Sequence, residues 1–323
     1  MSAVKTIGVL TSGGDAPGMN AAVRAVVRTA LANGIKVKGI YKGYNGLLNE
    51  EIKDMDAKSV SDTMSKGGTI LYTARCLEFI DPEYQKKGAD ICRKHGIDGI
   101  VVIGGDGSFK GAQKLSNLGI NTIAVPGTID LDIACTDYTI GFDTAINTAM
   151  TAIDKIRDTS TSHERCSIIE VMGRHAGHIA LWCGIANGAE DILLPGKYDF
   201  DEQRIIESII DNKKKGKKHH IIINAEGIGH SYEMAARIEA ATGVETRATI
   251  LGHMQRGGSP TCIDRVYASM MGSMAVDLLL EGKSNRVVAY KDGKFVDYDI
   301  DEALAMTKDI DENMYEVSKH LCR

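Results

Sequence analysis

The chain has 323 residues, of which 43% are hydrophobic and 25% charged, a composition that excludes disordered and collagen-like proteins. Its formal net charge is −5 and only 5% of its residues are aromatic, which argues against nucleic-acid binding, since that needs basic surfaces and often stacking platforms. None of the seven cysteines forms a CxxC pair, and residues 6–10 look like a strand with no apolar leader before them. We therefore expect reduced thiols, no membrane segment and a cytoplasmic protein.

Short apolar runs alternate with helical patterns along the chain. A helix is expected from about residue 20, an amphipathic one over 145–156 and a long one over 265–280. This alternation predicts βαβ units and an α/β fold with mainly parallel sheets. The pattern restarts near Tyr138–Gly141, where we place a domain boundary. The predicted strands are Ile7–Leu10, Val37–Tyr41, Gly99–Ile103, Thr122–Val125, Ser167–Val171, Asp191–Leu194, His220–Asn224 and Val287–Tyr290.

Two glycine-rich turns follow predicted strands. The turn at Gly13–Gly18 precedes a helix, so it is either a phosphate cradle or simply a tight connection. In Gly104–Ser108, three glycines surround Asp106. Backbone N–H groups there could bind polyphosphate while the carboxylate faces Mg²⁺, although structural glycines with an aspartate helix cap remain the alternative.

A third loop, Pro126–Asp132, carries two carboxylates two positions apart. If its backbone is extended, Asp130 and Asp132 point the same way, so that one could accept a proton while the other positions a metal or substrate. A solvated acidic loop is an equally good interpretation.

Cationic and polar side chains recur at loop positions later in the chain. Residues 252–260 set His253 and Arg256 among glycines, a pattern typical of an oxyanion clamp. The lysine cluster at 213–218 fits a solvated helix end as well as a ligand site. The sequence has no Walker A, GxGxxG, HExxH or GxSxG motif. The remaining parts favour phosphoryl transfer, in which positioning and charge stabilisation do most of the catalysis.

Five segments, in order and over nearly the whole chain, resemble the phosphofructokinase family, in particular its bacterial ATP-dependent 6-phosphofructokinases. They are residues 10–20, 104–108, 126–130, 172–174 and 252–260. The resemblance implies a glycolytic kinase that transfers the γ-phosphoryl of MgATP to the 1-hydroxyl of fructose 6-phosphate, giving fructose 1,6-bisphosphate and ADP. It also implies a homotetramer with active sites shared between subunits, and no nucleic-acid or membrane partner.

The same resemblance implies two Rossmann-like three-layer α/β/α domains with the active site in the cleft between them. Residues 1–139 plus about 255–305 would form the ATP-binding domain, and 140–254 plus about 306–323 the fructose 6-phosphate-binding domain.

Site residues carry over by position. Asp130 would be the general base, with Thr128, Asp132, Arg174 and Gly14 completing the catalytic set, and Asp106 would hold Mg²⁺. ATP would be bound by Gly14, Tyr44, Arg75, Cys76, Gly105, Asp106, Gly107 and Ser108. Fructose 6-phosphate would be bound by Thr128, Ile129, Asp130, Met172, Gly173, Arg174, Glu226, His253, Met254, Gln255 and Arg256, with Arg165 and Arg247 reaching in from a neighbouring subunit. An ADP or phosphoenolpyruvate effector site would use Arg24, Arg28, Arg157, Gly188, Glu190, Lys215, Lys217, Lys218 and His219.

Two positions bear on the phosphoryl donor. Similar pyrophosphate-dependent enzymes usually have Asp where this chain has Gly107, and Lys where it has Gly127. An aspartate at the first position would fill the space of the α-phosphate and add repulsive charge. Both positions being glycine favours ATP over pyrophosphate.

Three positions depart from the family pattern. Leu131 replaces the usual Asn between the two aspartates, His178 stands where Asp is common, and Leu77 replaces a usual proline. An apolar neighbour would desolvate Asp130, raise its pKa and slow the chemical step, unless Leu131 points into packing. An alternative is therefore a nucleotide- and sugar-phosphate-binding regulatory subunit with weakened catalysis.

Overall fold

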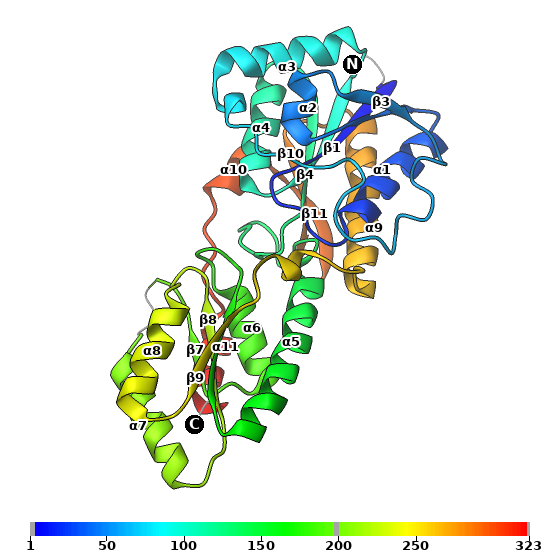
Figure 1. Cartoon of the computed structure of the whole chain (residues 1–323). Coiled ribbons are helices and arrows are strands. Elements are labelled where there is room, and N and C mark those ends of the chain that lie inside the picture. Colours follow the sequence, from blue (N-terminus) through cyan, green and yellow to red (C-terminus); the bar gives the residue numbers. More distant parts are fainter. Residues whose placement is uncertain (1–3, 197–199, 322–323) are drawn as a thin grey trace. The chain divides into compact units, whose positions relative to one another are not determined.

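The computed structural model describes residues 4–196 and 200–321. The chain divides into two compact units. The first contains residues 1–129, 133–144 and 256–308, and the second contains residues 130–132, 145–255 and 309–323. Each unit has a sheet of its own covered by helices (Figure 1).

The sheet of the first unit has seven strands in the order β11-β10-β5-β4-β1-β2-β3. Its five inner strands are parallel, while β3 and β11 pair antiparallel at the two edges. The parallel strands are apolar because helices cover both faces of the sheet. The strands are β1 (Thr6–Ser12), β2 (Lys36–Ile40), β3 (Ile52–Met55), β4 (Gly99–Gly104), β5 (Asn121–Pro126), β10 (Arg286–Lys291) and β11 (Lys294–Asp299).

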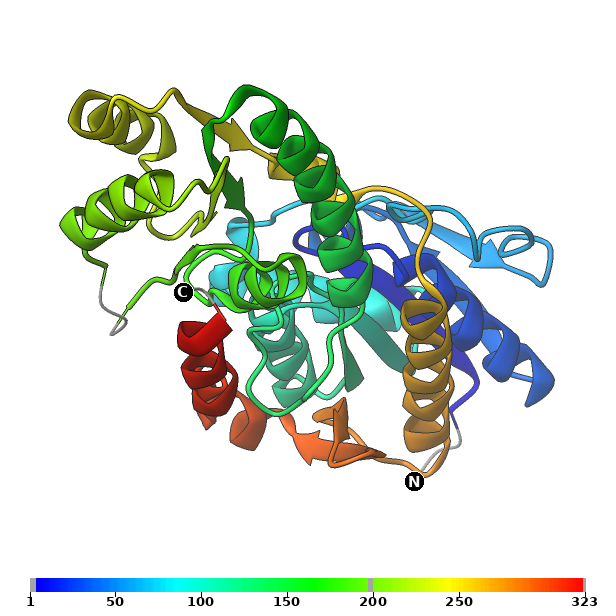
Figure 2. The ribbon, with the colours of Figure 1, turned by 90° about the horizontal axis from the view of Figure 1, so that it is seen from below.

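Two groups of helices pack on this sheet. The helices α1 (Met19–Ala32) and α9 (Cys262–Leu280) lie side by side, as Figures 1 and 2 both show. The other group consists of α2 (Gly43–Leu48), α3 (Pro82–Lys94), α4 (Asp106–Asn117) and α10 (Ile300–Ala305), with the short 3₁₀ helix η1 (Glu78–Ile80) next to α3. One continuous core joins this group to the sheet through buried residues such as Leu10, Leu47, Ile100, Phe109 and Leu115.

The sheet of the second unit has four parallel strands in the order β7-β8-β6-β9. A core of Ile168, Ile205, Ile209, Ile222 and Ile238 joins it to α7 and α8. The strands are β6 (Cys166–Val171), β7 (Asp191–Leu193), β8 (His220–Ala225) and β9 (Thr246–Ile250). The helices are α5 (Phe142–His163), which begins in the first unit, α6 (His178–Asn187), α7 (Glu202–Lys214), α8 (Ser231–Thr242) and α11 (Glu312–Leu321), and η2 (Gly252–Arg256) is a 3₁₀ helix.

The predicted α/β fold with mainly parallel sheets is confirmed, and each predicted strand exists within one or two residues. The pattern missed β3, β9 and β11, which alternate or mix polar residues with apolar ones because they lie at sheet edges. Within the described parts of the chain, no helix has both the length and the apolar character needed to cross a bilayer.

Candidate functional site

The carboxyl ends of three neighbouring strands in the first unit lie side by side. Ser12 at the end of β1 pairs in register with Gly104 at the end of β4, which pairs with Pro126 at the end of β5. The Gly127 N–H donates to the Gly104 carbonyl at 2.9 Å. The three turns that the sequence singled out therefore start at one sheet edge, where open α/β sheets bind their ligands.

The turn between β4 and α4 has no side chain or backbone packed against its glycines Gly105 and Gly107. The Ser108 hydroxyl donates to the Ser12 carbonyl at 3.1 Å and so ties the turn to β1. Atoms added as a Cβ at Gly105 or Gly107 would meet nothing within 4 Å. Asp106 is exposed at the first position of α4. This arrangement suits an anion with a metal, because the helix N-terminus favours negative charge and Mg²⁺ prefers oxygen ligands.

Tyr44 lies in the core beneath this turn. Its side chain is only 4% exposed, and it stacks on Phe79 with ring centroids 4.3 Å apart. Its hydroxyl donates to the Ser108 carbonyl at 2.7 Å, and burial raises its pKa well above the ordinary value. Tyr44 therefore supports α4 from the core side, and its expected contact with ATP stays a prediction.

Arg256 lies against the turn that follows β1. Its guanidinium donates to the Asp15 carbonyl at 2.9 Å. A Cβ at Gly14 would come within 2.7 Å of the same nitrogen, so only glycine permits this approach. The structure thus brings Gly14 and Arg256 together and gives the turn a fixed positive charge.

The loop after β5 returns to the strand that it leaves, because Gly127 and Ile140 form a β-bridge. Within the loop, Asp130 is 1% exposed, Thr128 is buried and Asp132 is half-buried. Leu131 is buried with a φ of 55°, in the left-handed region. The expectation that Asp130 and Asp132 lie on extended backbone is therefore wrong, because the residue between them turns the chain.

Three charged residues meet at the strand ends of the second unit. The Arg174 Nε lies 3.4 Å from the Asp130 carboxylate. The Arg174 N–H donates to Glu226 at 2.5 Å, and Glu226 directly follows β8. Arg174 follows β6 in the left-handed conformation, at φ 50°, after Gly173 at φ 126°. This sharp turn places the Arg174 guanidinium beside the Asp130 carboxylate, where the positive charge offsets part of the free-energy cost of burying the carboxylate.

The Met172 N–H donates to the buried Gln255 side chain at 2.9 Å. Because Met172 comes directly before the turn at Gly173, this bond fixes the end of β6. Gln255 therefore supports the expected substrate loop from within, whereas His253 and Met254, its neighbours in η2, are exposed.

Arg165 and Arg247 lie together at the other end of β6. Both side chains pair with Glu245, at 2.8 Å and 2.6 Å, and these pairs hold the pKa of Glu245 below its ordinary value. The strand between Arg165 and Arg174 spans roughly 20 Å at about 3.3 Å per residue. The two arginines and the Arg174 cluster are thus separate features of the second unit.

Part of the expected effector set meets in the second unit. The Arg157 guanidinium contacts the His219 ring at 3.0 Å and also donates to the Asn187 and Gly188 carbonyls. Burial lowers the pKa of His219.

Glu190 lies near the Arg157–His219 pair. It pairs with Lys217 at 2.6 Å and accepts from the Ile221 N–H. Burial opposes ionisation of Glu190, but these bonds keep its pKa below the ordinary value. Lys215 is the C-cap residue of α7, and Lys218 pairs with Glu164. Arg24 and Arg28 lie one turn apart on α1 of the first unit, where Arg28 donates to the Ala57 carbonyl.

The sequence matches the family described as Phosphofructokinase over residues 6–279. The chain belongs to the phosphofructokinase family. Proteins named ATP-dependent 6-phosphofructokinase from Clostridium botulinum and Clostridium acetobutylicum are each 59% identical to it, and each match covers 99% of this chain and 100% of the relative.

Solved phosphofructokinase structures share the fold. The Pichia pastoris enzyme in its T-state has a TM-score of 0.87 at 34% identity, and the match covers 99% of this chain but 39% of that one. For the Saccharomyces cerevisiae enzyme the values are 0.84 and 34%, with 98% and 46% covered, so this chain spans less than half of either yeast chain. A pyrophosphate-dependent phosphofructokinase from Marinobacter aquaeolei has a TM-score of 0.86 at 24% identity, covering 96% and 86%.

The sequence did not predict a hydrogen-bond network beside the turn that follows β1. The Asn20 side chain donates to the Lys66 carbonyl at 3.0 Å and accepts from the Ile70 N–H at 2.7 Å. The Thr73 hydroxyl donates to the Gly13 carbonyl at 2.8 Å. These bonds hold residues 66–73 beside the β1 turn and precede Arg75 and Cys76. A buried asparagine at the start of a helix was the available signal.

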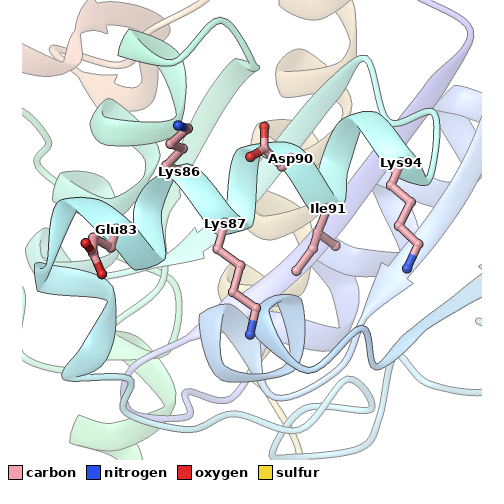
Figure 3. A pocket seen from close by; sticks show the side chains of 6 residues that line it. All are labelled: Glu83, Lys86, Lys87, Asp90, Ile91 and Lys94. Carbon is pink, nitrogen blue, oxygen red and sulfur yellow. The ribbon is translucent and has the colours of Figure 1, made fainter.

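A separate hollow of about 480 Å³ runs along α3 and is lined by Glu83, Lys86, Lys87, Asp90, Ile91 and Lys94 (Figure 3). Two of its charged residues have partners within the unit, because Asp90 pairs with Arg93 and Lys94 pairs with Glu50. In Figure 3, Lys86 and Asp90 extend on one side of the helix and Lys87 on the other. These side chains do not converge on one point, so we assign no ligand to this hollow.

Proposed function

We propose that this chain transfers the γ-phosphoryl of ATP to the 1-hydroxyl of fructose 6-phosphate. The observation that carries the proposal is the pair formed by Asp130 and Arg174, 3.4 Å apart. Asp130 lies in the loop after β5, and β5 and its neighbours β4 and β1 end side by side, so this loop and the two glycine turns start at the same place. Relatives of equal length with 59% identity and this printed activity support it. The first unit would bind ATP and the second fructose 6-phosphate, within the cytoplasm.

In the proposed reaction, Asp130 accepts the proton of the sugar 1-hydroxyl, whose oxygen then bonds to the γ-phosphorus. The bond from that phosphorus to the β-phosphate oxygen breaks, and ADP leaves. Arg174 stabilises the transferring phosphoryl group, and its own backbone is held by Glu226. In the first unit, Arg256 against the turn at Gly14 would offer positive charge to nucleotide phosphate, and Gly105 and Gly107 would offer open backbone.

The chain fits a magnesium ion that arrives with the nucleotide. Mg²⁺ usually takes one or two protein carboxylates together with phosphate oxygens and water. Asp106 offers one exposed carboxylate among open glycines, and the described residues contain no group of three or more His, Cys, Asp or Glu side chains that could hold a metal by themselves. Asp106 would hold the ion, which when bound neutralises phosphate charge.

The separation of Arg165 and Arg247 from Arg174 supports an active site shared between subunits. In one subunit these two arginines lie at the opposite end of β6 from Arg174 and pair with Glu245, so they would meet a sugar phosphate only in the site of a neighbouring subunit. The resemblance to bacterial phosphofructokinases makes a homotetramer the proposed assembly. The contacts among Arg157, Glu190, Lys217 and His219 likewise support an effector site for ADP or phosphoenolpyruvate.

Donor choice tests the proposal most simply. Initial rates with fructose 6-phosphate are measured with ATP or pyrophosphate, each with and without Mg²⁺. We expect magnesium-dependent formation of fructose 1,6-bisphosphate from ATP and little from pyrophosphate. Transfer from neither donor would refute the kinase activity, and a preference for pyrophosphate would refute the donor assignment.

A second candidate function is a regulatory subunit with weak turnover. The specific observation is that Leu131, between Asp130 and Asp132, adopts a left-handed backbone that costs a leucine roughly 1–2 kcal/mol. If this residue impairs catalysis, Leu131→Asn raises kcat sharply at unchanged substrate affinity. A wild-type enzyme that already turns over rapidly excludes this alternative.

A further inference from the structure

A buried carboxylate outside the proposed catalytic set organises one end of the Asp130 loop. Asp264 lies in the first turn of α9 and is fully buried. Its Oδ1 accepts from the Tyr138 hydroxyl and from the Gly141 N–H, both at 2.6 Å. Its Oδ2 accepts from the Thr144 N–H at 2.9 Å and also from the Thr144 hydroxyl. All four donors come from one short segment, 120 to 126 positions earlier in the chain.

That segment closes the loop that carries Thr128 and Asp130. Ile140, between two of the donor residues, bridges to Gly127 at the start of the loop. Thr144 also accepts from the Thr261 N–H at 3.0 Å, which returns the network to the residue before α9. Both limbs of the loop belong to the first unit. Asp264 therefore fixes the end of the loop, and through the bridge it fixes the beginning.

The first turn of α9 also lies next to the turn that follows β1. A Cβ at Gly18, the last residue of that turn, would meet the Ile140 side chain at 2.8 Å, and the Asp264 Cβ and backbone carbonyl oxygen at 3.4 Å. Gly18 itself has a φ of 105°, in the left-handed region that glycine tolerates. The β1 turn, the end of the Asp130 loop and the first turn of α9 thus pack against one another at Ile140 and Asp264.

Burying a carboxylate at this position costs desolvation free energy. Burial raises the pKa of Asp264, against the opposing effect of its four donors. An apolar side chain of similar size would avoid that desolvation, but it would leave the Gly141 and Thr144 N–H groups without this acceptor. The group is therefore better explained by the geometry that it imposes than by the stability that it adds.

We propose that Asp264 is a positioning residue for phosphoryl transfer: it holds the Tyr138–Thr144 segment so that the loop presents Thr128 and Asp130 in one arrangement. The inference rests on the proposed function, since the loop matters only if it carries the catalytic base. A misplacement of about 1 Å in such a site costs on the order of 100-fold in rate.

The test compares Asp264→Asn with Asp98→Asn. The amide at 264 places its NH₂ group against either the Gly141 or the Thr144 N–H, whichever way it is turned. Asp98 is a matched control in the same unit, because its carboxylate accepts from the Lys5 and Thr6 N–H groups at the opposite ends of the strands.

For Asp264→Asn we expect kcat to fall by about 10- to 100-fold while the KM values stay near wild type. For Asp98→Asn we expect little change in kcat. A folded Asp264→Asn with wild-type kcat overturns the proposal.

Two further measurements decide the matter if Asp264→Asn fails to fold or the wild type shows no kinase activity. Tyr138→Phe and Thr144→Val each remove one hydroxyl from the network and should each lower kcat several-fold; wild-type kcat in both overturns the proposal. Hydrogen exchange does not depend on activity. Amides of residues 127–144 should exchange faster than in wild type in the Tyr138 and Thr144 variants, and at the wild-type rate in Asp98→Asn. Equal protection of this segment in all the variants also overturns the proposal. A wild type without kinase activity refutes the proposed function separately.

Discussion

Asp130 is the single residue whose chemistry the proposed reaction requires. Asp130→Ala removes the proton acceptor, so kcat should fall by about 10²- to 10⁴-fold, the usual contribution of a general base. Steady-state kinetics with both substrates measure this, and KM for ATP should change little because the nucleotide is bound elsewhere. Asp54→Ala, on the exposed edge strand β3, is the control. Unchanged kcat in Asp130→Ala removes this residue from the role of base.

Leu131 gives a second test at the scale of one residue. At a left-handed position, glycine avoids the strain that any Cβ brings, so Leu131→Gly should be more stable than Leu131→Ala by about 1 kcal/mol. Denaturant unfolding measures both. At Leu115, inside α4, the same pair of changes should show the reverse order, because glycine is about 1 kcal/mol worse than alanine in a helix. A less stable glycine variant at 131 would mean that the left-handed turn is not strained.

The sequence could place the residues of the turns but not their conformations. Gly105, Asp106 and Asp130 follow apolar strands, and the carboxyl ends of parallel strands meet at one edge, so their grouping was predictable. The left-handed backbone at Leu131 was not, because nothing local favours it in a leucine. The burial of Tyr44 depends on Phe79, which is far from it in the sequence.

At the scale of elements, we expect the first turn of α4 to select the phosphoryl donor. Gly107 borders open space, so Gly107→Asp should fold normally, and an acidic residue in the first turn suits the helix dipole. The added charge should repel ATP phosphates and lower kcat/KM for ATP by about tenfold or more. Gly107→Ser adds bulk without charge and should have a smaller effect. An unchanged kcat/KM in Gly107→Asp would show that α4 does not contact the nucleotide phosphates.

The buried parallel strands and the long helices were predictable because their apolar patterns are continuous. The edge strands β3 and β11 were not predictable, since they have partners on one side only and carry charged residues. Gly127 adds a point that spacing alone misses: a Cβ there would come within 3.1 Å of Ile103 and Met19. A side chain at this position would therefore require the Ile103 and Met19 side chains to shift by a few tenths of an ångström.

At the scale of the whole molecule, a shared active site predicts complementation between subunits. Asp130→Ala and Arg247→Ala should each be nearly inactive alone. In a two-fold pair, a mixed pair retains one of its two sites. Half of randomly formed pairs are mixed, so the hybrids should recover about one quarter of wild-type activity. Co-expression with two affinity tags isolates the hybrids. Activity no higher than that of the parents would place Arg247 in its own subunit's site or outside the site.

The division of the molecule could not be derived from linkers, because no proline- or serine-rich segment separates the units. The chain crosses between them inside the Asp130 loop and again after residues 144, 255 and 308. Such crossings depend on long-range packing, which local patterns do not record.

The most direct measurement is the structure of the protein with fructose 6-phosphate and a non-hydrolysable ATP analogue bound together. The account predicts an Asp130 carboxylate oxygen within hydrogen-bond reach, about 2.6–3.2 Å, of the sugar 1-hydroxyl, and nucleotide phosphates on the turns at Gly14 and Gly105–Ser108. A sugar hydroxyl well beyond that distance from Asp130, with both reactants fully bound, would contradict it.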